Sequence, residues 1–162
     1  MDIRAFKRKD FPAVKAIYQQ GIDTGNASFQ TKAKSWRDWH SSMLVACRLV
    51  AEKDNQLVAW AGLLPTSSRE VYAGVAEVSI YVANTAQGQG IGQKLLSALI
   101  TETEQQGFWM LQAGIFPENT ASVRLHKNNG FRILGTREKL GYMQGKWRDV
   151  VIMERRSKTV GA

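Results

Sequence analysis

Two titratable side chains in this sequence have the type and setting that proton transfer requires. Glu77 interrupts the alternating segment of residues 76–82, where a carboxylate is unusual, and His126 is one of only two histidines. A carboxylate in a buried strand has a raised pKa and can act as a general base, and a histidine can accept or donate a proton near neutral pH. The residues alone also fit a solvent-facing Glu77 and a structural His126, so both are candidate catalytic residues at this point.

A glycine-rich turn follows the same segment. The sequence QGQGIG at residues 87–92 places Gly88, Gly90 and Gly92 between a strand pattern and an amphipathic helix pattern. Such a turn lets backbone N–H groups approach a phosphate, and the helix N-terminus adds partial positive charge. The third glycine comes one residue too early for a dinucleotide fingerprint, and a phosphate-binding Walker loop needs a lysine directly after its last glycine. The turn therefore predicts a different anion site, or a tight turn without a ligand.

The surrounding patterns predict alternating strands and helices. Strands are expected at residues 1–6, 49–52, 57–64, 76–82, 108–116, 131–135 and 145–154. Helices are expected after Asp10 and Ser35, from residue 91 to Gly107, and from the cap Asn119 to about residue 128. Residues 53–56 should form a hairpin turn, residues 21–31 a loop, and the strand 108–116 should be buried on both faces because it is apolar nearly throughout. The fold class is mixed α/β.

Length and composition limit the kind of protein. The 162 residues fit a single domain, 1–162, with a flexible tail at about 156–162. The formal charge of +8 favours anionic partners. One cysteine, Cys47, excludes an internal disulfide, no apolar stretch approaches a membrane span, and no Cys/His cluster has metal-ligand spacing. A cytoplasmic protein without a metal or membrane partner is expected.

The sequence resembles the GNAT acetyltransferase superfamily over about residues 3–155, and within it the phosphinothricin and methionine sulfone acetyltransferases. The resemblance rests on GVAEVSIYV (74–82), QGQGIG (87–92), QAGIFPENTAS (112–122), LHKNNGF (125–131) and REKLGYMQGKWRDV (137–150). It implies a mixed, mostly antiparallel sheet of about seven strands, flanked by about four helices and splayed between the fourth and fifth strands. Many members carry a tyrosine that can protonate the departing thiolate where this chain has His126, as the phosphinothricin subgroup does.

The same resemblance implies acetyl-CoA as cosubstrate and assigns site residues. The pantetheine arm would pair with the strand edge, the pyrophosphate would lie in the turn, and Asn119 and, more weakly, Asn128 would contact the cofactor. These cofactor-binding positions are Ile80, Tyr81, Val82, Gly88, Gln89, Gly90, Ile91, Gly92, Gln93, Asn119 and Asn128. Glu77 would be the base, and His126 would share that role or protonate the leaving thiolate.

For the acceptor, the resemblance implies a small amino-acid-like molecule held by Phe29, Arg69 and Tyr72. Arg69 offers the forked donor that suits a carboxylate or phosphinate. Acetyl transfer to the α-amine of the acceptor, directly within a ternary complex, is the expected reaction, and a homodimer is expected by analogy.

Two alternatives remain open: acetylation of a protein or peptide amine, and a non-enzymatic basic module that binds nucleic acid. The latter needs exposed aromatic residues interleaved with basic ones, whereas four of the five tryptophans lie at core-like spacings, namely Trp36, Trp39, Trp60 and Trp109.

Overall fold

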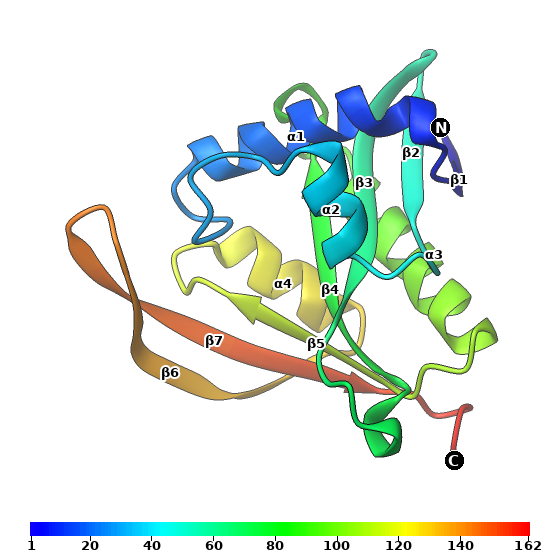
Figure 1. The fold of residues 1–162 in the computed structure, drawn as a ribbon, viewed down its shortest axis with the longest axis vertical. Coiled ribbons are helices and arrows are strands. Elements are labelled where there is room, and N and C mark those ends of the chain that lie inside the picture. Colours follow the sequence, from blue (N-terminus) through cyan, green and yellow to red (C-terminus); the bar gives the residue numbers. More distant parts are fainter.

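A single seven-stranded sheet runs through the chain in the order β1-β2-β3-β4-β5-β7-β6 (Figure 1), in a computed structural model that describes residues 1–162. The strands are β1 (Asp2–Ala5), β2 (Leu49–Lys53), β3 (Gln56–Pro65), β4 (Val75–Val82), β5 (Met110–Ile115), β6 (Arg132–Met143) and β7 (Lys146–Arg156). All neighbouring strands are antiparallel except β4 and β5, which are parallel. The predicted mixed, mostly antiparallel sheet is confirmed.

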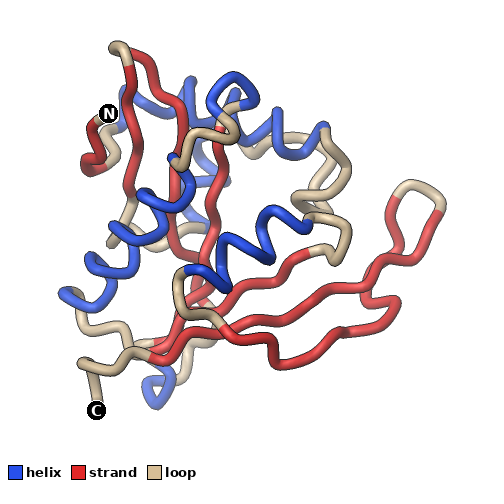
Figure 2. Tube along the Cα trace, turned by 180° about the vertical axis from the view of Figure 1, so that it is seen from behind, coloured by secondary structure: helices blue, strands red, loops and turns tan.

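Four α-helices cover the sheet: α1 (Phe11–Asp23), α2 (Trp36–Ser42), α3 (Ile91–Gln105) and α4 (Thr120–Asn128). Seen from the two sides in Figures 1 and 2, α1 lies on one face of β3 and β4 and α3 on the other. The core on the α1 side is aromatic, since Trp60 of β3 packs against Tyr18 and Trp39, each at 5.7 Å between ring centroids. No helix is both long enough and apolar enough to cross a membrane.

The strands β4 and β5 part after a short parallel contact. They pair only at Val75–Met110, Ala76–Leu111 and Glu77–Gln112. Beyond Glu77, β4 continues to Val82 with β3 on one side only, whereas β5 turns away to pair with β7. The predicted splay between the fourth and fifth strands is confirmed, and it leaves one backbone edge of β4 free.

The hairpin turn and the helix cap that adjacent residues predict are both confirmed. Asp54 and Asn55, between β2 and β3, both have positive φ, 53° and 63°, as a two-residue hairpin turn requires. The side chain of Ser35 accepts a hydrogen bond from the Asp38 N–H at 3.3 Å and caps α2. These segments fold as their own sequence dictates.

The prediction that residues 108–116 are buried on both faces is wrong. In β5 the residues Leu111, Ala113 and Ile115 are buried, whereas Gly114 is exposed and Gln112 is half-buried. β5 lies in a mostly antiparallel sheet, which can leave one face open to solvent, and the alternating burial of its residues shows that only one face is fully covered.

Two boundary predictions around α1 also fail. Asp10 does not cap α1 with its side chain, because its carboxylate accepts hydrogen bonds from the Lys7 N–H at 2.7 Å and from both terminal nitrogens of Arg4. The Arg4 hydrogen bonds lower the pKa of Asp10. The loop expected from Gly21 begins later, since α1 runs to Asp23.

The C-terminal strands are longer than predicted. β6 extends to Met143 and β7 to Arg156, forming a two-stranded arm that projects from the body of the sheet (Figures 1 and 2). Pairing with β7 holds β6 in place, although β6 is exposed along almost its whole length. Flexibility of the tail at 156–162 stays a prediction. In the structure Arg156 donates to the carbonyls of Val160 and Gly161.

Candidate active site

The glycine-rich turn presents a row of backbone donors. The N–H groups of residues 87–93 donate no hydrogen bond within the protein, and the first bond of α3 is donated by Lys94 to the Gly90 carbonyl. Gly88 and Gly90 have φ of +76° and +75°, and a Cβ at either position would meet nothing within 4 Å. No side chain caps α3. These amides and the positive end of the helix can therefore receive a phosphate group.

Contacts from three parts of the chain hold this turn in place. The side-chain oxygen of Gln89 accepts from Lys53 Nζ at 2.6 Å, and Gln93 and Asn129 exchange two side-chain hydrogen bonds of 3.1 and 2.9 Å. Gly92 faces Leu125, where a Cβ would lie 3.4 Å from the leucine side chain. Ile91 is buried in the core. The turn is thus positioned before any ligand arrives.

The free edge of β4 leads from this turn toward Glu77. Ile80, Tyr81 and Val82 pair with β3 on one side and have no strand on the other. The Tyr81 ring points toward α1, where it stacks on Trp60 at 5.2 Å and lies against Gly21. Burial raises the pKa of Tyr81. Its backbone is consequently what the residue can offer to a ligand along this edge.

Glu77 lies where β4 and β5 begin to separate. It is half-buried, and burial raises the pKa of its carboxyl, while a hydrogen bond with Gln112 of β5 acts in the opposite direction. A carboxylate with a raised pKa binds a proton more readily than an ordinary glutamate does. The position suits a general base.

His126 of α4 is 2 % exposed and packs edge-on against Phe131 at 4.9 Å. Its Nδ1 lies 2.8 Å from the Ser122 carbonyl oxygen. A carbonyl can only accept, so Nδ1 carries the proton. Burial lowers the pKa of His126, and its buried Nε2 has no hydrogen-bond partner. The neutral ring therefore keeps a lone pair on Nε2.

The two asparagines predicted to contact the cofactor are placed differently from each other. Asn119 caps α4, accepting from the Ser122 N–H and donating to the Asn26 carbonyl, both at 3.2 Å. Asn128 is exposed and lines a groove with Arg124 and Lys127. Its neighbour Asn129 is the residue that reaches the α3 N-terminus, which the sequence did not predict, although the tandem asparagines before Gly130 mark a helix end.

The predicted acceptor residues form two groups. Arg69 and Tyr72 lie together and exposed just before β4, with the guanidinium 5.5 Å from the tyrosine ring centroid. Phe29, in the loop after α1, packs against the C-terminal arm. Its ring lies edge-on to Phe116, with 4.9 Å between the centroids, and covers Gly141. No direct contact joins the two groups.

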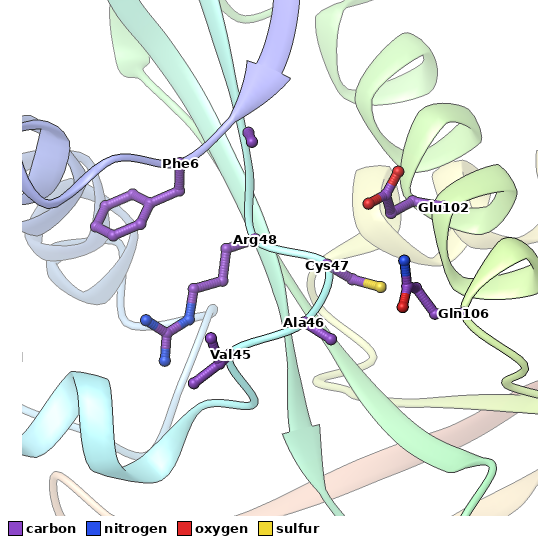
Figure 3. A pocket seen from close by; sticks show the side chains of 8 residues that line it. Phe6, Val45, Ala46, Cys47, Arg48, Glu102 and Gln106 are labelled. Atoms are coloured by element: carbon purple, nitrogen blue, oxygen red, sulfur yellow. The ribbon is translucent and has the colours of Figure 1, made fainter.

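A cavity of about 310 Å³ lies elsewhere, between the start of β2 and the far end of α3 (Figure 3). Cys47 and Glu102 line it, and burial together with Glu102 raises the pKa of the thiol to about 11. The neighbouring Arg48 already donates to the carbonyls of Leu44, His40 and Met43. The length of α3, about 22 Å at 1.5 Å per residue, separates this cavity from the glycine turn. A protonated thiol is a poor nucleophile, and Cys47 belongs to no candidate site.

No three His, Cys, Asp or Glu side chains form a group that could hold a metal ion.

Two curated proteins show what this chain is similar to. The phosphinothricin N-acetyltransferase of Alcaligenes faecalis is 34% identical over 163 residues, covering 94% of this chain and 81% of that protein. The L-methionine sulfoximine/L-methionine sulfone acetyltransferase of Pseudomonas aeruginosa is 27% identical, covering 90% of this chain and 88% of that protein.

Solved structures share the fold over nearly the whole chain. One, described as an acetyltransferase of Salmonella typhimurium with its cofactor acetyl-CoA, has a TM-score of 0.89 at 28% identity and covers 99% of this chain and 96% of that chain. Another, described as the ribosomal-protein-alanine N-acetyltransferase of Brucella melitensis, has a TM-score of 0.88 at 32% identity and covers 97% and 100%. The model of the acetyltransferase (GNAT) family matches residues 9–131, the span that holds β4, the glycine turn and α4. This chain therefore belongs to the GNAT acetyltransferase family and is an enzyme that uses acetyl-CoA.

Proposed function

We propose that this enzyme moves the acetyl group of acetyl-CoA onto the α-amine of a small amino-acid-like acceptor, of the kind represented by phosphinothricin, methionine sulfoximine and methionine sulfone. One observation carries the proposal: the unpaired amides of residues 87–93 lie at one end of the free β4 edge, and Glu77 lies at the other end. An anion anchor and a proton acceptor thus share one rigid strand.

The chain's own backbone would hold the cosubstrate. The amides of Gly88 to Gln93 would bind the pyrophosphate, and the backbone of Ile80, Tyr81 and Val82 would pair with the pantetheine arm. This fits the positive φ of Gly88 and Gly90 and the open space where their Cβ atoms would point. The net charge of +8 adds long-range attraction for the three phosphates of coenzyme A.

The transfer step requires a neutral amine. Glu77 takes a proton from the ammonium group, directly or through a water, and the amine nitrogen then attacks the thioester carbonyl carbon. A backbone N–H near Val82 stabilises the oxyanion, the C–S bond breaks, and the thiolate leaves as coenzyme A, gaining the proton that the amine loses. No covalent enzyme intermediate is needed, in line with direct transfer within a ternary complex.

His126 assists this step as a proton acceptor or a positioning group in our proposal. With Nδ1–H bound to the Ser122 carbonyl and a lowered pKa, its free Nε2 offers a lone pair, not a proton. Among the roles that the sequence left open, protonation of the thiolate is the one this tautomer disfavours.

The acceptor would be held by the positive charge of Arg69 and by the aromatic side chains of Tyr72 and Phe29. Arg69 with Tyr72 forms an exposed cationic and aromatic pair at the entrance to β4, which suits a carboxylate or phosphinate. Phe29, 41% exposed on the arm, offers an apolar surface for the acceptor side chain. In this scheme Asn119 and Asn128 contact the cofactor.

Thiol release from acetyl-CoA tests the acceptor class. We expect turnover with phosphinothricin, methionine sulfoximine or methionine sulfone, and little with a lysine peptide or an alanine-terminated peptide. The peptide arms matter because the Brucella melitensis structure carries the name of a protein acetyltransferase. Silence with every small amino acid and activity on either peptide would replace the small acceptor by a protein amine.

We further propose a homodimer. The edge strand β6 and its hairpin expose large apolar side chains, namely Ile133, Leu134, Leu140, Tyr142 and Trp147. An exposed apolar edge strand favours association with another chain. Light scattering should give about twice the chain mass of 18.1 kDa, and a mass of one chain at micromolar concentration would contradict the dimer.

We also place the enzyme in the cytoplasm and outside the nucleic-acid-binding and membrane-binding classes. Its one cysteine is buried and protonated, which suits a reducing compartment. Trp39 and Trp60, which a nucleic-acid platform would need at the surface, are both 2 % exposed.

A further inference from the structure

The segment of residues 24–31, which carries Phe29, forms neither helix nor strand. Two distant side chains hold it. Arg148 of β7 donates from Nη1 to the Gly25 carbonyl and from Nη2 to Asn26 Oδ1, both at 2.8 Å. Asn119, at the start of α4, donates from Nδ2 to the Asn26 carbonyl at 3.2 Å. Arg148 thus holds Gly25 and Asn26, and Asn119 holds Asn26 as well, just ahead of Phe29.

Arg148 is almost completely buried, at 2 % exposure. Its guanidinium lies 4.0 Å from the centroid of the Phe116 ring, and Phe29 packs edge-on against that same ring at 4.9 Å. Its carboxylate partner, Glu118 at 3.2 Å, has a side chain that is half exposed. A buried cation is costly unless hydrogen bonds satisfy it, and the loop accepts two of the three that Arg148 makes, while its buried Nε has no partner.

The Phe29 ring is fixed from a second direction by the arm. It lies against Gly141 of β6 so closely that a Cβ there would come within 2.5 Å of the ring. Arg148, Phe116 and Gly141 thus bind one short loop to the C-terminal arm, whereas the glycine turn is held by Lys53, Leu125 and Asn129. Different residues support the acceptor side and the cosubstrate side.

We propose that Arg148 is a positioning residue for the acceptor. It holds residues 25 and 26 so that the Phe29 ring lies beside the acceptor, and Arg148 itself does not touch the reacting atoms. The proposal rests on the proposed function, in which Phe29 contacts the acceptor. Arg148 is suited to this because its planar fork has two separate nitrogens, one bonded to the Gly25 carbonyl and the other to the Asn26 amide oxygen, whereas a lysine has a single nitrogen without fixed orientation.

The main test is Arg148→Met, which preserves bulk and removes every donor. We expect the KM for the acceptor to rise about tenfold or more, because two charge-assisted hydrogen bonds to the loop are lost. The KM for acetyl-CoA should stay within about twofold, and kcat should fall less than the acceptor KM rises. Hydrogen exchange of residues 24–31 should become faster. Arg148→Lys, which restores the charge and one donor, should recover part of the acceptor KM.

Arg132→Met is the matched control. Arg132 lies on the same arm and pairs with Glu154 at 2.8 Å, but it is exposed and does not touch the loop. Its loss should leave both KM values unchanged. This separates the loop contact from any general effect of removing an arginine from the arm.

A second variant keeps the proposal testable if Arg148→Met does not fold. Asn26→Ala removes the side-chain oxygen that accepts from Arg148 Nη2 and leaves the bond from Nη1 to the Gly25 carbonyl in place. We expect a smaller rise in the acceptor KM than in Arg148→Met and no change in the KM for acetyl-CoA. An unchanged acceptor KM in Asn26→Ala would contradict the part of Arg148 in holding the loop.

A failure of the Arg148 proposal can be distinguished from a failure of the proposed function. An unchanged acceptor KM in folded Arg148→Met overturns this proposal and leaves the proposed function intact. No thiol release by the wild-type enzyme with any small acceptor overturns the proposed function, and this proposal with it.

Discussion

Glu77→Gln is expected to lower kcat by about 10²- to 10⁴-fold, the usual contribution of general acid–base catalysis. The amide has nearly the shape of the carboxylate but cannot take the proton from the ammonium group. Acetyl-CoA binding should be unchanged, because the amides of residues 87–93 lie at the other end of β4. Steady-state kinetics with the best acceptor of the thiol-release panel, and calorimetry with acetyl-CoA, measure the two quantities separately.

The pH dependence of kcat/KM is a second test of Glu77 as the general base. Only ionised Glu77 can accept a proton, so kcat/KM for the wild type should fall as the pH drops through the pKa of Glu77. Burial raises that pKa above the usual 4.5, so the fall should begin at a higher pH than for an ordinary glutamate. Glu77→Gln should lose this acidic limb.

His126→Asn is the companion variant, because its amide can still donate toward the Ser122 carbonyl while the Nε2 lone pair is lost. It should also reduce kcat while keeping acetyl-CoA binding. Normal turnover in both variants would remove the catalytic assignment of Glu77 and His126.

Gly90→Ala should weaken acetyl-CoA binding about tenfold or more. The residue has φ +75°, and the added Cβ would point into the open space in front of the amides, where a phosphate oxygen would approach. Displacing the pyrophosphate from charge-assisted hydrogen bonds accounts for an effect of this size. Calorimetric titration with acetyl-CoA is the measurement.

Gly107→Ala is a matched control at the opposite end of α3. Gly107 has φ +90°, and a Cβ there also meets nothing within 4 Å. Both variants should lose about 1–2 kcal/mol of folding stability from left-handed backbone strain. Only Gly90→Ala should lose affinity, and equal affinities in the two variants would show that the turn does not hold the pyrophosphate.

The parts of the fold that the sequence predicts well are those decided by neighbouring residues. The Asp54–Asn55 turn and the Ser35 cap follow from local conformational preferences and local hydrogen bonds. The mostly antiparallel character of the sheet and the parting of β4 from β5 came from the resemblance of segments such as GVAEVSIYV and QGQGIG to a family, since no local pattern states which strands pair.

The failed prediction at Asp10 and the missed residue Arg148 both depend on contacts that the pattern of a single helix or strand does not contain. Asp10 was an obvious helix cap in sequence, but Arg4 and the Lys7 N–H take its oxygens. Arg148 carried no signal at all, because its partners are 122 and 123 positions away. An arginine in a strand pattern is ordinarily a solvated residue, and only the fold shows that this one is buried.

Strand order also has a consequence for how the chain is completed during synthesis. β7, the last strand made, lies between β5 and β6, so residues 132–143 can join the sheet only after residues 146–156 have left the ribosome. The loop near the N-terminus that carries Phe29 then receives its Arg148 contacts from this final segment. The glycine turn can therefore form before residues 146–156 emerge, whereas the proposed acceptor side is complete only after them, so we expect a chain that stops before β7 to lack turnover.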